Sequence, residues 1–174
     1  MIHTIEYKDE VYPNFQTEGN ASQFAIPFAK KVCHGKGFDV GYSKPEWCFP
    51  GAVGVDDGKI FAHCKEVETE CDAQNLPLKE GDTVDYIFSS HCLEHLDRWV
   101  DVLDHWYNHL AYGGTLFLYL PHPSQKYWAP FSNRKHVHFL HPKDLKAYLK
   151  HRGYKKIFVS KRDLNHSYCV MAEK

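Results

Sequence analysis

The sequence lacks the features that mark membrane, secreted and strongly charged proteins. No run of apolar residues approaches the roughly 18 that a membrane-spanning helix needs. The start of the chain lacks the apolar core of a secretory signal. The 21 basic and 22 acidic side chains leave a net charge of −1, so no overall field draws the chain to nucleic acid or to a membrane. We therefore expect a cytoplasmic protein with no membrane partner.

Three short motifs with known chemistry are also missing. None of the six cysteines forms a CxxC pair, which argues against a zinc ribbon or a thioredoxin-type site and favours reduced thiols. No P-loop occurs, so nucleoside triphosphate hydrolysis of that type is disfavoured. Residues 41–46 read GYSKPE instead of GxGxxG, and Pro45 argues against a long helix that would hold a pyrophosphate. A nicotinamide cofactor is therefore disfavoured.

What the sequence does contain is an alternation of apolar strands and amphipathic helices. Its 174 residues, 43% of them hydrophobic, suit one domain. The pattern predicts strands at 37–41, 52–56, 67–72, 83–90, 115–120, 156–160 and 167–172, and helices at 22–32, 93–110 and 142–152. This order indicates an α/β domain with a Rossmann-like, mostly parallel sheet. The short polar link at 161–166 predicts that the last strand is antiparallel.

Polar and small residues gather where the predicted strands end. They are Asp39, Gly41, Asp56, Asp57, Asp72, Ala73, Ser90 and His91. The carboxyl ends of parallel strands form one edge of a sheet, where α/β proteins bind their ligands. A carboxylate after the second strand can accept both hydroxyls of a ribose, and the next carboxylate can accept an exocyclic amine. We therefore expect a nucleoside-shaped ligand across these strand ends.

Five sequence blocks carry a resemblance to a known family. In order they are FDVG (38–41), FPGAVGVD (49–56), DAQNLP (72–77), VDYIFSSHCLEHL (84–96) and LAYGGTLFLYLP (110–121). In order and spacing they resemble a class I S-adenosylmethionine-dependent methyltransferase of the methyltransferase-11 type, over roughly residues 36–121. The resemblance implies the class I methyltransferase fold and S-adenosylmethionine as the cofactor.

The resemblance also implies roles for the residues at the strand ends. It places Asp39 near the methionine moiety, Asp56 on the ribose, and Asp72 with Ala73 on the adenine. Gly41 would let the ligand approach the backbone. Ser90 and His91 would lie beside the methionine end.

The sequence departs from the family pattern after the first strand. The family's usual GxGxG loop keeps only Gly41, and ten residues separate Gly41 from Ala52. We therefore expect the helix that normally follows this strand to be missing or reduced to a turn. An alternative follows from this departure, namely a non-catalytic binding domain that keeps the sheet and has lost the donor.

Histidines are abundant, 13 in all, and they raise two interpretations of the acceptor side. In the first, His95 or His138 is a general base that takes a proton from the acceptor. In the second, His91, Glu94, His95 and His138 bind a metal. That set is similar to the E-x-x-E-H pattern of small-RNA 2′-O-methyltransferases and ubiquinone-pathway O-methyltransferases. The block SHCLEH also resembles a common variant without metal, so we predict no metal and keep a metal-assisted RNA 2′-O-methyltransferase as an alternative.

These observations predict one domain that methylates an oxygen or nitrogen of a small-molecule or glycan-like acceptor. Its parts are an N-terminal extension and helix (1–35), a donor-binding core (36–121), an acceptor-side loop (122–141) and a C-terminal helix with strands (142–174). The loop is long and aromatic, so we expect it to cover the acceptor with His138 turned inward. Basic residues in the last third leave nucleic acid as a less favoured partner. The oligomeric state stays open.

Overall fold

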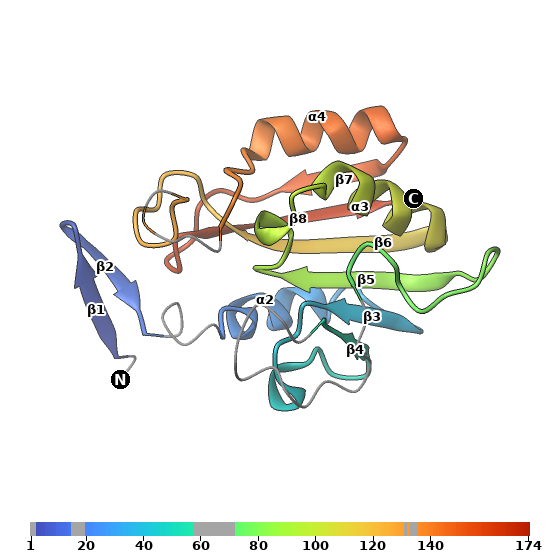
Figure 1. Ribbon diagram of the computed structural model, residues 1–174, viewed down its shortest axis with the longest axis horizontal. Helices are drawn as coiled ribbons and strands as arrows, with labels where there is room; N and C mark the ends of the chain where they lie inside the picture. The colour runs from blue at the N-terminus through green and yellow to red at the C-terminus, as the bar shows by residue number, and fades with distance from the viewer. Residues whose placement is uncertain (1–2, 15–19, 58–71, 131, 133–135) are drawn as a thin grey trace.

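The computed structural model describes residues 3–14, 20–57, 72–130, 132 and 136–174. The main feature of these residues is a six-stranded sheet with the order β4-β3-β5-β6-β8-β7. Its strands are β3 (Gly37–Val40), β4 (Val53–Val55), β5 (Val84–Ser90), β6 (Leu110–Pro121), β7 (Lys155–Val159) and β8 (Ser167–Glu173). The first four pair in parallel, and β8 pairs antiparallel with β6 and β7. The predicted mostly parallel sheet with an antiparallel last strand is confirmed (Figure 1).

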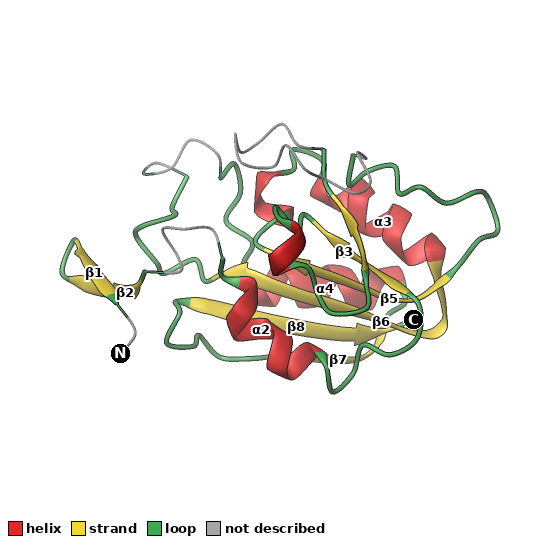
Figure 2. Ribbon diagram, turned by 90° about the horizontal axis from the view of Figure 1, so that it is seen from below, coloured by secondary structure: helices red, strands yellow, loops and turns green. Residues whose placement is uncertain are grey.

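Helices cover both faces of the sheet. They are α2 (Ser22–Ala29), α3 (Trp99–His109) and α4 (Pro142–Arg152). Successive side chains of a strand point to opposite faces, so Leu118 packs in the core with α3 and α4, whereas Phe117 packs with α2. Figure 1 shows α3 and α4 on one side and α2 on the other, and Figure 2 shows α2 from its own side. A membrane span would need a longer and more apolar helix than any that the described residues form.

The helix predicted over residues 93–110 is shorter than expected. Its first part is a separate 3₁₀ turn, η2 (Leu93–His95), which ends where Leu96 takes an extended conformation with ψ 116°. The α-helix then begins at Trp99 and ends at His109. Leu110 is already extended because it pairs with β5 as the first residue of β6.

Two other predicted elements also differ from the structure. The helix predicted over 22–32 ends at Ala29. The strand predicted over 67–72 lies outside the described residues except for Asp72, which belongs to no strand.

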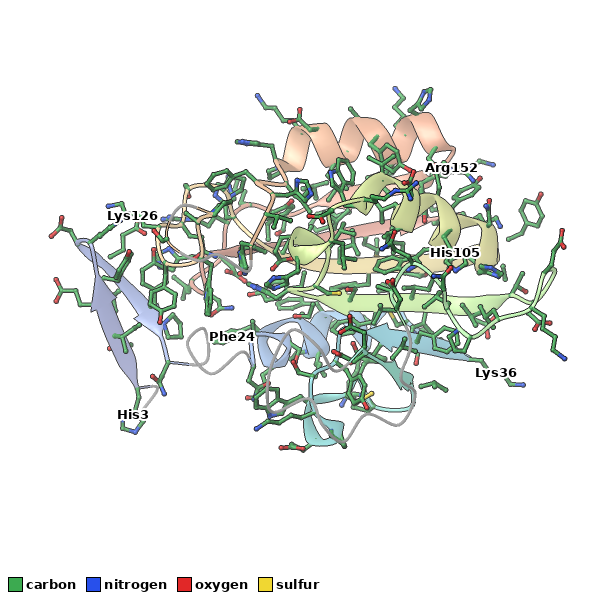
Figure 3. All side chains as sticks on the ribbon, in the orientation of Figure 1. His3, Phe24, Lys36, His105, Lys126 and Arg152 are labelled. Carbon is green, nitrogen blue, oxygen red and sulfur yellow. The ribbon has the colours of Figure 1, made fainter. Side chains whose placement is uncertain are left out.

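An N-terminal hairpin was not expected from the sequence. Strands β1 (Thr4–Tyr7) and β2 (Glu10–Pro13) pair antiparallel around a two-residue turn. The hairpin lies beyond the end of the sheet at which the parallel strands finish (Figure 1). It contacts the sheet's loops through several residues, among them Tyr12, whose hydroxyl accepts the backbone N–H of Lys126 at 2.9 Å. Figure 3 shows Lys126 beside the hairpin.

Candidate active site

Five of the residues predicted to bind the donor line one small pocket at the carboxyl ends of the parallel strands. They are Gly41, Asp56, Asp57, Asp72 and Ala73, together with the apolar side chains of Val40, Val55 and Leu96 and with Cys92. Strand register explains the convergence of Gly41 with Asp56 and Asp57, because Val40 of β3 lies opposite Val55 of β4. The residues that follow each strand are therefore delivered to the same place. The pocket combines carboxylates with an apolar wall.

The turn after β3 keeps the shape of a glycine-rich loop with one glycine. Gly41 has φ +82°, and its N–H donates to the carbonyl of Val55 at 2.8 Å. A Cβ at this position would lie 2.6 Å from Sγ of Cys92, so no side chain fits. Ser43 takes the place of the family's second glycine and also has a positive φ of 67°. Its N–H donates to Oδ2 of Asp56 at 3.3 Å, which links the turn to the predicted ribose carboxylate.

The connection from β3 to β4 contains a short turn in place of a helix, as expected from its length. A 3₁₀ turn, η1 (Pro45–Trp47), is the only helical element in residues 41–52, all of which the structure describes. Pro45 opens this turn, and Lys44 places its Nζ 4.4 Å from the ring centroid of Trp47. Such a short turn offers no long helix N-terminus to the pocket.

Helix α3 holds the Asp72–Ala73 side of the pocket in place. Buried Trp106 donates its indole N–H to the carbonyl of Ala73 at 2.8 Å. Nε2 of His105 accepts the N–H of Leu76 at 3.1 Å. Oδ1 of Asp72 accepts the N–H of Gln74 at 2.9 Å, which closes a local turn. Sequence reasoning placed Trp106 only on the apolar face of a helix, and nothing in the pattern linked it to residues 33 positions earlier.

Three residues predicted to bind the donor do not line this pocket. Asp39 is 1% exposed, and its Oδ2 accepts the N–H of Phe49 at 2.6 Å. Burial raises the pKa of Asp39 to about 7. Ser90 ends β5 with a buried hydroxyl that has no hydrogen-bond partner among the described residues. His91 has φ +50°, and its Nε2 lies 3.0 Å from Oγ of Ser167.

A cluster of side chains surrounds Glu94, which lies on η2, shortly after the pocket residue Cys92. Glu94 is fully buried, and its Oε1 lies 3.5 Å from Nδ1 of His91 and 3.7 Å from Nε2 of His136. The ring of His95 meets the ring of His136 edge to face, with centroids 4.5 Å apart. Burial raises the pKa of Glu94 and lowers the pKa of His91 and of His136, so all three favour their neutral forms.

The set of possible metal ligands considered from the sequence contained His138, and the structure has His136 in its place. His136 is the histidine of the loop that reaches Glu94, and it is 4% exposed. His138 is half-buried, and its Nε2 lies 3.2 Å from the carbonyl of Asp97. Both histidines line a small cavity together with Trp128. In the alternative metal set His138 stood beside Glu94; in the structure His136 takes that place.

The aromatic residues of the loop after β6 pack onto neighbouring parts of the chain. Tyr127 lies against Tyr7 and Tyr12 of the hairpin, with ring centroids 5.3 and 5.6 Å away. Trp128 stacks on His136 at 5.4 Å. Phe131, a third aromatic residue of this loop, lies outside the described residues. The hairpin and the loop thus form one layer beyond the strand ends.

Comparison with known proteins agrees with this arrangement. The family model described as a methyltransferase domain matches residues 18–158. No protein with a curated function matches the sequence.

Several solved structures share the fold. A S-adenosylmethionine-dependent methyltransferase from Archaeoglobus fulgidus has a TM-score of 0.69 at 20% identity, over 91% of this chain and 94% of that one. Another S-adenosylmethionine-dependent methyltransferase, from Thermotoga maritima, has a TM-score of 0.70 at 17% identity, over 92% of this chain and 93% of that one. Human N-acetylserotonin methyltransferase, solved with S-adenosylmethionine, has a TM-score of 0.58 at 16% identity, over 80% of this chain and 47% of that one.

Proposed function

Because this chain belongs to the methyltransferase domain family, we propose that it transfers a methyl group from S-adenosylmethionine to an oxygen or nitrogen of a small-molecule or glycan-like acceptor. The observation that carries the proposal is the convergence of Gly41, Asp56, Asp57, Asp72 and Ala73 on one pocket. Carboxylates suit hydroxyl and amine donors, and the apolar wall suits a flat base, so the residues present fit a nucleoside. S-adenosylmethionine, when bound, supplies an activated methyl group on its sulfonium.

The pocket residues have distinct roles in this proposal. Asp56 accepts the ribose hydroxyls, with Asp57 beside it. Asp72 and Ala73 hold the adenine, supported by the bond from Trp106 to Ala73. Gly41 leaves the backbone open to the ligand. These roles require only hydrogen bonds and shape, because the chain's main task in methyl transfer is to align the reactants and to exclude water.

We assign Ser90, His91 and Asp39 to the methionine end of the ligand. Ser90 and His91 come directly before Cys92, which lines the pocket. Among the residues that the structure describes, the buried hydroxyl of Ser90 has no hydrogen-bond partner, so it can hydrogen-bond a ligand. Asp39 acts indirectly, because its bond to Phe49 fixes the connection that follows Gly41.

We assign proton removal from the acceptor to His95 or His138. His95 ends η2, next to the pocket residue Leu96. Nε2 of His138 is within hydrogen-bond distance of the Asp97 carbonyl. A carbonyl only accepts, so this bond needs the proton on Nε2 and leaves Nδ1 of neutral His138 as the basic atom. Imidazole is the usual side-chain base in catalysis at neutral pH.

One observation favours a second candidate, a binding domain that no longer methylates. The β3–β4 connection has a single 3₁₀ turn and a serine at the second glycine position of the loop. Both features reduce the backbone groups that a donor could contact.

Calorimetry with S-adenosylmethionine and S-adenosylhomocysteine tests the proposal. We expect one binding site for each ligand, and we expect the methylated acceptor to appear when candidate hydroxyl and amine compounds are offered with the methyl donor. Failure of both ligands to bind would overturn the proposal and support the second candidate. Binding without transfer to any acceptor would support the second candidate with the donor site retained.

A further inference from the structure

Glu94, His95 and His136 bring three metal-ligating atoms together beside the proposed donor pocket. One carboxylate oxygen and one nitrogen from each ring all lie within 4.8 Å of one another. We propose that these three side chains bind a divalent transition-metal ion, with Zn²⁺ as the first candidate. The inference goes beyond methyl transfer and does not depend on it, because it concerns only these residues.

The carboxylate of Glu94 is the strongest observation. It is fully buried, and neither oxygen has a hydrogen-bond partner among the described residues. The nearest nitrogens, Nδ1 of His91 and Nε2 of His136, lie 3.5 and 3.7 Å from Oε1, which is beyond a normal hydrogen bond. A buried polar group without a partner is costly. A cation between the carboxylate and the rings would remove that cost.

The spacing of the atoms suits an ion. Zn²⁺ binds nitrogen and carboxylate oxygen at about 2.0–2.2 Å, so two ligands of a tetrahedral site lie roughly 3.3 Å apart. The 3.7 Å between Oε1 of Glu94 and Nε2 of His136 is close to that separation.

The backbone holds the two parts of the site together. The N–H groups of Val137 and His138 donate to the carbonyl of Glu94 at 3.0 and 3.3 Å, which fixes the loop against η2. The ring of His136 is held from one side by Trp128, stacked at 5.4 Å. This support means that the ligands are already positioned before a metal binds.

His91 is placed to orient the carboxylate of Glu94 without binding the metal itself. Its Nε2 lies 3.0 Å from Oγ of Ser167, and its Nδ1 faces Oε1 of Glu94. Groups that orient metal ligands in this way raise metal affinity without touching the metal.

The types of ligand decide the class of metal. Two imidazoles and one carboxylate suit zinc and other transition ions, whereas magnesium and calcium prefer oxygen ligands. Three protein ligands leave a position open, as in catalytic zinc sites. If His95 binds a metal, its ligating nitrogen is not available as a base, and His138 is then the remaining candidate for proton removal.

Metal content and Zn²⁺ binding of the purified, untagged full-length protein test the proposal. We expect close to one equivalent of a divalent transition metal, and tight binding when Zn²⁺ is titrated into chelator-treated protein. Co²⁺ in place of Zn²⁺ should give the visible absorption of a low-coordinate site. Glu94→Gln and His136→Ala should each weaken Zn²⁺ binding by more than the roughly 10- to 100-fold that loss of a supporting residue causes.

His138→Ala is the matched control, since it removes a histidine of the same loop and should leave Zn²⁺ affinity unchanged. Circular dichroism and the Zn²⁺-dependent rise in melting temperature separate lost binding from lost folding: a folded Glu94→Gln variant should no longer respond to Zn²⁺. Metal-free protein with no Zn²⁺ affinity would overturn the proposal. Equal affinity in wild type and the folded His136→Ala variant would overturn it as well, as would loss of binding in His138→Ala alone.

Discussion

The backbone N–H of Phe49 donates a 2.6 Å hydrogen bond to the buried carboxyl of Asp39, which ties the middle of β3 to the turn that leads into β4. Burial raises the pKa of Asp39 from an ordinary 3.8 to about 7, and the bond from Phe49 only partly offsets this rise. The folded protein therefore holds a proton that the unfolded chain has lost over this range of pH. The stability that this group contributes is complete below about pH 4 and is lost as the pH rises to about 7.

Asp39→Asn tests this effect, because an amide oxygen can still accept from Phe49 and does not titrate. We expect the free energy of unfolding of wild type, relative to Asp39→Asn, to fall by about 4 kcal/mol between pH 4 and pH 8. Urea unfolding of both proteins across this range measures the difference. A difference that stays constant with pH would show that Asp39 titrates normally.

Ser43 gives a second prediction, because it holds a left-handed conformation with φ +67°. A residue with a Cβ pays roughly 1–2 kcal/mol in that region, and glycine does not. Ser43→Gly should therefore be more stable than Ser43→Ala by about 1 kcal/mol. The alanine variant is the control, since both changes remove the hydroxyl and only one keeps the Cβ. Chemical denaturation measures the two; an alanine variant as stable as the glycine variant would contradict the conformational cost.

The sheet could be predicted from the sequence because its strands carry their own signal. The run from Val84 to Ser90 is buried at every position except Asp85, as expected for a strand covered on both faces, and it forms the central strand β5. Five of the eight predicted donor residues also meet in one pocket. Gly41, Asp56 and Asp57 do so because parallel strands that end together deliver their following residues together, whereas Ala73 is held there by Trp106 of α3.

The N-terminal hairpin could not be predicted because its turn has an unusual sequence. Lys8 and Asp9 form the two-residue turn with φ of 51° and 65°. That turn type normally signals itself through Asn-Gly or a similar pair. Here contacts with the rest of the chain, such as those of Tyr12, accompany a turn with no local signal.

The sequence also could not predict which of the two loop histidines, His136 or His138, lies beside Glu94. The loop that holds them has no helix or strand in its described part, so no periodicity assigns a direction to either side chain. The direction follows from the bonds of Val137 and His138 to the carbonyl of Glu94. Such a contact joins residues more than 40 positions apart, and a single sequence does not contain it.

Asp56 provides the sharpest test of the donor pocket. If its carboxylate accepts the ribose hydroxyls, Asp56→Ala should cost about 1.5–3 kcal/mol of S-adenosylhomocysteine binding, or roughly 10- to 150-fold in affinity. Glu80→Ala is the matched control, because Glu80 is an exposed carboxylate that does not line the pocket. Calorimetry on both variants gives the comparison, and circular dichroism checks their folding. Equal affinity in wild type and Asp56→Ala would remove the ribose assignment.

The layer formed by the hairpin and the loop rests on the hydroxyl of Tyr12. This side chain is fully buried, donates to a carboxylate oxygen of Glu10, and accepts the N–H groups of Lys126 and Tyr127 at 2.9 and 3.4 Å. Tyr12→Phe removes one oxygen atom and leaves those groups without that partner. We expect a loss of about 1 kcal/mol in the free energy of unfolding, the usual net contribution of a hydrogen bond between partly exposed groups.

Tyr7→Phe is the control for the same chemical change on the same hairpin. The hydroxyl of Tyr7 is exposed and donates to Oγ of Ser132 at 3.4 Å, so its loss should change stability by less than about 0.5 kcal/mol. Hydrogen exchange separates a local from a global effect. In Tyr12→Phe the amides of Lys126 and Tyr127 should exchange faster than in wild type, because they lose their bonds to the hydroxyl. Those of β5 and β6 should keep their protection, because the two strands pair with each other in the sheet. Equal exchange at these two amides in both variants would mean that the loop holds its conformation without the hairpin, and that Tyr12 serves only the hairpin itself.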